Sequence, residues 1–313
     1  MAGAERHMVV RFRGVRGSHP VPGPRTVRYG GNTSCVEVQI EHYRIVFDAG
    51  TGIISLGDEL LRHHVNSHSE PLQREPIVLT IFFSHTHYDH TQGLPFFKPI
   101  FLPSTTCFLF GPKMLEHPFE EGLRRAMVSP YFPVNLEDLQ SVRVIRSVKP
   151  SEVIVFPEGS IYPEVYNVYR ERHLYETAPI KVWVGHSLGH PDGGVYMYRL
   201  EYQGRSVVYV TDTEGYVGGD RRVIQFARNA DVLIHDSQYL PDDYLCEVYP
   251  VQGFGHSTCE MAADVARQAG VRQLVLYHYD PQYDDNQIDR MVELARKIFP
   301  ATVGAHEGLV LEV

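Results

Sequence analysis

The sequence predicts a single α/β domain in which helices enclose β-sheet, and three observations predict it. Segments with strand patterns alternate with segments of helical periodicity along the 313 residues. The composition, with 43% hydrophobic and 21% charged residues, is ordinary for a soluble globular protein with a sizeable core. The sequence contains neither a Pro-rich or Ser-rich linker nor a repeat of roughly 20–50 residues. We therefore expect one domain over residues 1–313.

The first half of the chain begins with strand patterns around one helical pattern. Short runs rich in β-branched and aromatic residues predict the strands. The run EPIVLTIFFSH is apolar almost throughout, as expected for a strand covered on both faces. A Gly-Thr-Gly turn leads into the segment of helical periodicity. We expect strands at 7–14, 34–40, 43–50 and 75–85, and a helix at 52–64.

Residues 111–140 are expected to form an insertion over the sheet, or a lid. A short amphipathic helix comes first, the turn sequence SPYFPV follows, and a second helical start ends the segment. Within the turn, Tyr131 and Phe132 either form part of a wall for a substrate or pack the insertion against its surroundings.

The second half of the chain continues the alternation of strand and helix. Ser257 or Thr258 is expected to cap one of the helices, because a hydroxyl can accept a hydrogen bond from the first turn. We expect strands at 180–187, 194–202, 205–213, 231–239, 272–280 and 308–313, and helices at 220–230, 257–271 and 283–300.

Three histidines and an aspartate are concentrated at the end of the apolar run 75–85. In the sequence HTHYDH, alternate residues of an extended loop point the same way. His85 and His87 can therefore bind one ion, while Asp89 and His90 turn toward a neighbouring one. Strand ends are where α/β proteins place their sites, so the pattern favours two metals over a His-rich surface loop.

Two metals need more ligands than this motif provides. Each ion of a hydrolytic pair typically takes about three or four protein ligands and keeps an open position for water. Later strand ends supply further candidates, which are His186, His190, Asp212, His235, Asp236, His256 and His278.

Taken together, these motifs resemble the metallo-β-lactamase superfamily. The resemblance is carried by HTHYDH, by GHPDGG, by a strand that ends in TD, by GHST at a helix start and by LYHYDP. It is strongest for the phosphodiesterase branch that contains tRNase Z and the phosphonate-pathway cyclic phosphodiesterase, to which GVRGSHPVPGPRTVRYGGNTSCVEV and FDAGTG are also similar. The resemblance implies a four-layer αββα sandwich of one domain.

The resemblance also implies a set of metal ligands. His190 is preferred to His186 because it stands before PDGG, as in the family. The implied set places His85, His87 and His190 around the first metal, Asp89, His90 and His278 around the second, and Asp212 between the two.

The sequence limits the possible roles of three further residues. Asp48 either orients a ligand histidine, as the resemblance implies, or caps the helix that follows. His235 is flanked by apolar residues and is expected to be a core histidine. His256 stands at a helix start, where an imidazolium and free N–H groups both favour an anion, so we expect it to bind phosphate or donate a proton.

The expected activity is that of a dinuclear-metal phosphodiesterase. Paired divalent cations about 3.5–4 Å apart generate hydroxide at neutral pH, so a metal-bridging hydroxide is expected to attack phosphorus. Asp89 would hold one ion and steer the hydroxide, while His256 would stabilise charge and protonate the leaving oxygen. A ligand set of His and Asp suits Zn²⁺, with Mn²⁺ or Fe²⁺ as alternatives.

The expected substrate is a small phosphodiester, namely a cyclic phosphate or a cyclic nucleotide. A formal net charge of −9 without a Lys/Arg-rich run argues against large RNA and against an anionic membrane as partners. The chain also departs from tRNase Z, because it lacks a basic Gly/Pro-rich arm and has no arginine in YHYDPQY. A thioesterase or lactonase on the same fold and a tRNase Z-like nuclease are the alternative enzymes. A non-catalytic sensor is disfavoured because every expected ligand position is filled.

Other sequence features bear on the cellular location, the cysteines and the oligomeric state of the protein. Its apolar runs fall short of the roughly 20 residues of a membrane span, and its first residues lack a signal-like apolar segment, so we expect a cytoplasmic protein. Four cysteines without a C-x-x-C pair predict neither a disulfide framework nor a zinc knuckle. A homodimer is what the resemblance implies.

Overall fold

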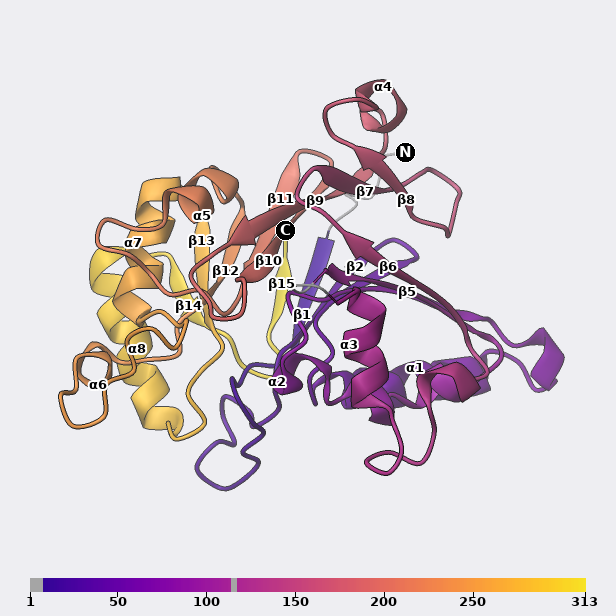
Figure 1. Ribbon diagram of the computed structural model, residues 1–313, viewed down its shortest axis with the longest axis horizontal. Helices are drawn as coiled ribbons and strands as arrows, with labels where there is room; N and C mark the ends of the chain where they lie inside the picture. The colour runs from indigo at the N-terminus through magenta and orange to yellow at the C-terminus, as the bar shows by residue number, and fades with distance from the viewer. Residues whose placement is uncertain (1–7, 114–116) are drawn as a thin grey trace, which may run out of the picture.

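Two β-sheets packed face to face form the centre of the protein (Figure 1). The computed structural model describes residues 8–113 and 117–313. Within these residues, the first sheet has the strand order β15 (Val310–Glu312), β1 (Met8–Gly14), β2 (Cys35–Ile40), β3 (Tyr43–Phe47), β4 (Ile77–Phe82), β5 (Thr105–Pro112) and β6 (Val142–Val148). The second has the order β14 (Thr302–Gly304), β13 (Gln273–Tyr277), β12 (Val232–Asp236), β11 (Arg205–Val210), β10 (Val195–Tyr202), β9 (Ile180–Ser187), β7 (Glu152–Phe156) and β8 (Glu164–Asn167).

Helices cover the outer face of each sheet, which gives the expected four-layer αββα sandwich (Figure 1). The helices over the first sheet are α1 (Ile53–Ser67) and α3 (Phe119–Ala126), and those over the second are α5 (Arg221–Phe226), α7 (Cys259–Ala269) and α8 (Asp285–Ile298). Single-turn helices lie in the loops, namely α2 (Tyr88–Thr91), α4 (Arg172–Tyr175) and α6 (Pro241–Tyr244). Of the two residues considered as the cap of α7, Thr258 is the one whose side chain accepts the N-terminal hydrogen bond.

The core lies between the two sheets and contains stacked aromatic rings. Phe47 of β3 stacks on Tyr198 of β10 and on Tyr209 of β11, with ring centroids 5.8 and 5.2 Å apart. Strand β4 is covered on both faces, as its apolar sequence predicts. Phe82 belongs to the cluster between the sheets, while Ile81 belongs to the cluster under the helices.

Several expected elements end earlier than their apolar patterns. The strand expected at 43–50 ends at Phe47, the one at 205–213 ends at Val210, and the one at 272–280 ends at Tyr277. In each case a residue with positive φ follows within two positions, and this turns the chain off the strand. Five strands were not predicted, namely β5, β6, β7, β8 and β14.

The segment 111–140 connects β5 to β6 and packs on the first sheet. Phe119 and Leu123 of helix α3 and Leu136 are buried in the cluster under the helices. Phe132 packs on Phe96 with ring centroids 5.8 Å apart, which supports a packing role for it, whereas Tyr131 is 84% exposed. Residues 114–116 of this segment and residue 7 of the first expected strand lie outside the described residues. That the segment acts as a lid stays a prediction.

None of the helices in the described ranges combines the length and the apolar character that a membrane crossing requires.

Candidate metal centre

The residues predicted to bind metals come together at strand ends between the two sheets. His85 and His87 lie in the loop after β4, and Asp89 and His90 lie in the single-turn helix α2. The remaining residues come from the second sheet, where Asp212 follows β11, His278 follows β13 and His190 lies in the loop between β9 and β10. Since β3 and β4 are parallel, as are β11, β12 and β13, their carboxyl ends meet on one side of the molecule.

Backbone strain is concentrated at three of these strand ends. Asp48, Asp212 and His278 have φ values of 60°, 49° and 64°. The left-handed region is unfavourable for residues with a Cβ and persists only where the surrounding structure imposes it. In the second sheet, β11 and β13, which lie on either side of β12, therefore turn sharply where they deliver side chains to the site.

The first cluster consists of His85, His87 and His190. Nε2 of His190 lies 3.2 Å from Nδ1 of His87, and the ring centroids of His85 and His87 are 4.4 Å apart. One nitrogen from each residue lies within 4.8 Å of the others. His186 is not part of this cluster, because its Nε2 is hydrogen-bonded to the backbone oxygen of Gly193 at 2.8 Å.

The second cluster consists of Asp89, His90, Asp212 and His278. Oδ2 of Asp89 lies 3.1 Å from Nε2 of His278 and 3.2 Å from Nε2 of His90. Oδ1 of Asp212 lies 3.2 Å from Nε2 of His90, and its Oδ2 lies 3.6 Å from Nε2 of His85. Asp212 thus presents one oxygen to each cluster, which is the arrangement of a bridging carboxylate.

Hydrogen bonds behind the rings fix where their lone pairs point. Nδ1 of His90 lies 2.8 Å from Oδ2 of Asp48, and because a carboxylate only accepts, this nitrogen carries the proton. Nδ1 of His190 faces the backbone oxygen of Gly255 at 3.2 Å in the same way. When these rings are neutral, both Nε2 atoms therefore offer a lone pair toward the centre of the site.

The donor atoms fit divalent metal ions. Within the described residues, Nε2 of His85 and Nε2 of His90 are buried and have no hydrogen-bond partner. A buried polar atom without a partner is costly, and a bound cation satisfies such a nitrogen. Imidazole nitrogens beside carboxylate oxygens are the donors that Zn²⁺ and related divalent ions prefer.

The charges around the site are consistent with a bound cation. Burial and the nearby His90 hold the pKa of His85 well below its usual value. Burial also disfavours a charge on His90, but Asp212 and Asp89 outweigh it and raise the pKa of His90 well above its usual value. Burial would raise the pKa of Asp89 and of Asp212, yet the facing histidines hold both well below their usual range. Both carboxylates are therefore negative in the folded protein.

Asp48 orients a ligand candidate and does not cap the next helix. Besides His90, its carboxylate accepts hydrogen bonds from the backbone N–H of Ser84 at 2.7 Å and from Oη of Tyr209 at 2.8 Å. The N-cap position of α1 is occupied by Gly52. Of the two roles considered for Asp48, the contact with His90 supports the first.

Asp236 and His256 form a buried pair beside the second cluster. Nδ1 of His256 lies 2.8 Å from Oδ2 of Asp236, and its ring stacks on that of His278 with centroids 5.1 Å apart. Burial lowers the pKa of His256, but Asp236 outweighs this effect and raises that pKa to about 9. The role of Asp236 was not assigned from sequence. Its position as the last residue of β12, like the other strand-end residues, was the available indication.

His235 and Ser18 also lie near the second cluster, and each has a defined hydrogen-bond partner. His235 is 1% exposed and its Nδ1 is hydrogen-bonded to the backbone oxygen of Asp236, which confirms the expected core histidine. The backbone N–H of Ser18 donates to Oδ2 of Asp89 at 2.8 Å. The N-terminal loop therefore supports the second cluster, a contact that was not predicted.

An αββα sandwich with paired histidine and aspartate clusters at its strand ends defines a class of metal-dependent hydrolases. The pattern of the Beta-lactamase superfamily domain matches residues 43–279, and the chain belongs to this family. It is therefore a metal-dependent hydrolase, and its buried clusters fit the divalent ions that the fold implies.

The chain is similar in sequence to a ribonuclease and in fold to a diphosphatase and a tRNase. Ribonuclease Z of Thermoplasma acidophilum is 30% identical over 257 residues, which cover 74% of this chain and 78% of the relative. The structure of a diphosphatase from the PhnP family superposes with a TM-score of 0.63 at 17% identity and covers 98% of each chain. The short form of human tRNase Z superposes with a TM-score of 0.58 at 19% identity over 97% of this chain and 98% of that one. These two structures show the same fold.

Proposed function

We propose that this hydrolase is a phosphodiesterase with two metal ions, and that its substrate is a small phosphodiester such as a cyclic phosphate or cyclic nucleotide. The observation that carries the proposal is Asp212, whose two oxygens face two separate histidine clusters. In this proposal the ligands of the first ion are His85, His87 and His190, those of the second are Asp89, His90 and His278, and Asp212 is shared. Zn²⁺ is the proposed ion, because imidazole dominates the ligand set.

Two bound divalent ions would lower the pKa of water and neutralise negative charge on a phosphate ester. The protein's own contribution is to orient its side chains and to hold a proton. Asp48 fixes His90, and Gly255 fixes His190. Because Nδ1 of His256 is bonded to Asp236, Nε2 is the nitrogen that remains to donate to a phosphate or leaving oxygen. A buried imidazolium beside the ions favours an anionic substrate over a neutral thioester or lactone.

A nuclease similar to ribonuclease Z is the second candidate. It is favoured by the 30% identity to Ribonuclease Z of Thermoplasma acidophilum. The net charge of −9 disfavours binding of a long RNA polyanion. Exposed arginines that could bind its phosphates are paired with glutamates, so both features favour the small substrate. For example, Arg124 and Arg125 of α3 are paired with Glu137 and Glu121.

Turnover by Zn- and Mn-loaded protein tests both candidates. The substrates are bis-p-nitrophenyl phosphate, 2′,3′- and 3′,5′-cyclic nucleotides, a precursor tRNA, a thioester and a lactone. The Asp89→Ala, His90→Ala double variant should lose activity, whereas His186→Ala removes a histidine outside both clusters and should retain it. Turnover of cyclic nucleotides in preference to precursor tRNA supports the proposal. Cleavage of precursor tRNA alone selects the nuclease, and cleavage of thioesters or lactones alone rejects both.

A further inference from the structure

Glu214 connects three loops around the metal centre and lies two residues after Asp212. Its carboxylate accepts hydrogen bonds from the backbone N–H of Gly253, at 2.9 Å to each oxygen, and from that of Gly255 at 3.2 Å. It also accepts one from the phenol of Tyr244. Its own backbone N–H donates to the oxygen of Gly189, the residue before His190, at 2.8 Å.

The loop held by Glu214 contacts His190 directly. The oxygen of Gly255 accepts the hydrogen bond from Nδ1 of His190. Gly255 has a φ of +92°, and a Cβ at this position would lie 2.2 Å from Nδ1 of His190, so the loop and the ring are in close contact. The residue after Gly255 is His256, which is bonded to Asp236. A displacement of this loop would therefore move a proposed ligand and the proposed proton donor together.

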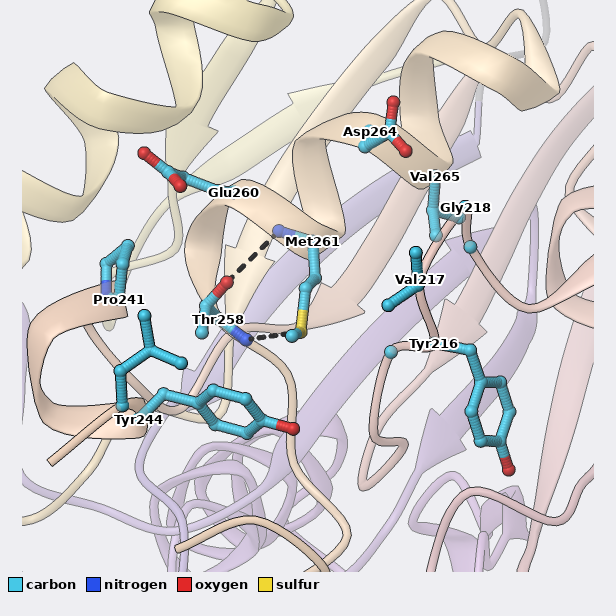
Figure 2. Close-up of a pocket in the computed structure, with 13 residues that line it drawn as sticks. Tyr216, Val217, Gly218, Pro241, Tyr244, Thr258, Glu260, Met261, Asp264 and Val265 are labelled. Carbon is cyan, nitrogen blue, oxygen red and sulfur yellow. Dashed lines mark hydrogen bonds between the residues drawn. The ribbon is translucent and has the colours of Figure 1, made fainter. Parts of the chain in front are cut away.

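Glu214 also links this loop to a groove on the surface, which is shown in Figure 2. The groove has a volume of about 320 Å³ and lies between the loop 215–219, helix α6 and the start of helix α7. Tyr244 and Met261 line it, and Glu260 lies at the first turn of α7 (Figure 2). Because the hydroxyl of Tyr244 donates to Glu214, one wall of the groove is bonded to the residue that holds the loop.

We propose that Glu214 is a positioning residue for His190 and His256, which acts through the loop 253–256. A carboxylate suits this role because its two oxygens accept three donors at once, including two backbone N–H groups that no other side chain satisfies in the described residues. The inference rests on the proposed ligand set, but its test requires no knowledge of the substrate.

The test measures the affinity of each of the two metal equivalents by competition with a chromophoric zinc chelator. In Glu214→Ala, one equivalent should bind about 10- to 100-fold more weakly and the other should bind as in the wild type, because only the first cluster contains His190. Glu214→Gln should restore part of the affinity, since one oxygen still accepts hydrogen bonds. Tyr244→Phe removes a single donor and should have a smaller effect in the same equivalent.

The matched control is Glu260→Gln, which removes a carboxylate from the same groove without touching the loop 253–256. It should leave both equivalents unchanged. Thermal unfolding of each metal-free variant shows whether the fold is retained, and Tyr244→Phe keeps the test valid if Glu214→Ala unfolds. Equal loss of both equivalents, or wild-type affinity for both in Glu214→Ala and Tyr244→Phe, would overturn the inference. Neither result would bear on whether the enzyme hydrolyses phosphodiesters.

Discussion

Oδ2 of Asp48 lies 2.8 Å from Nδ1 of His90, although 42 residues separate them in the chain. Asp48 follows β3 and His90 follows β4, and these two strands are parallel neighbours. A carboxylate at the end of one strand therefore sets the tautomer of a histidine delivered by the next. Such partners tune the affinity of a ligand as well as its orientation.

Asp48→Asn should weaken metal binding, because an amide accepts the hydrogen bond of His90 without the negative charge. We expect about a 10- to 100-fold lower affinity for the equivalent held by His90. Zinc titration against a chelator measures the change. Asp58→Asn is the control, since this exposed residue of α1 is paired with Lys98. Unchanged affinity in Asp48→Asn would mean that the hydrogen bond does not support a ligand.

Gly17→Ala should disturb the second cluster selectively. A Cβ at this position would lie 2.5 Å from Cε1 of His278 and 2.7 Å from Oε1 of Gln238. Because both neighbours are buried, His278 would have to move, and one metal equivalent should be lost. Gly23→Ala in the same loop is the control, because a Cβ there meets nothing within 4 Å. Metal content per protein after gel filtration distinguishes the two variants.

Tyr209→Phe should destabilise the protein. The phenol donates to Asp48 in the core between the sheets, and both side chains are fully buried. Removing the donor from a buried carboxylate should cost about 1–3 kcal/mol in the free energy of unfolding. Chemical denaturation measures it, with the exposed Tyr162→Phe as the control. A change no larger than that of the control would contradict the prediction.

His256→Gln should lower turnover while leaving both metals bound. Nδ1 of His256 is committed to Asp236, so the residue is placed to hold a proton and is not in the proposed ligand set. Loss of a general acid typically lowers kcat by about 10²- to 10⁴-fold. Zinc content and kcat should be measured on the same preparation. Loss of a metal equivalent would instead make His256 a ligand, within the group it forms with Asp212, Asp236 and His278.

Metal removal should lower the thermal stability of the protein. Ions that bind only the folded state stabilise it, by about 2.7 kcal/mol when the free metal is at 100 times its Kd. Melting curves with zinc and with a chelator measure the difference. It should shrink in the Asp89→Ala, His90→Ala double variant, since two donors of the second cluster are gone. A difference as large as that of the wild type would exclude these residues as ligands.

The order of elements and the core of the site follow from local sequence patterns. HTHYDH lies within six consecutive positions, so its geometry is that of one loop and one helical turn. The strands of the αββα sandwich that were predicted have apolar runs, whereas β6, with sequence VRVIRSV, contains two arginines and a serine and was missed. β6 is an edge strand of the first sheet, and how much of an edge strand is buried depends on its neighbours in the fold. The local sequence pattern carries no information about those neighbours.

By itself, the sequence determined the fold class, the HTHYDH motif and the choice of His190 over His186 as a member of the first cluster, because each depends on short-range spacing or on a family resemblance. Only the tertiary structure decided the hydrogen-bond partners of Asp48, Asp236 and Glu214. Their partners lie 42, 20 and 39–41 residues away in the chain, across strand ends and loops. A carboxylate's role depends on which donor the fold places beside it, and that placement follows from how the two sheets pack.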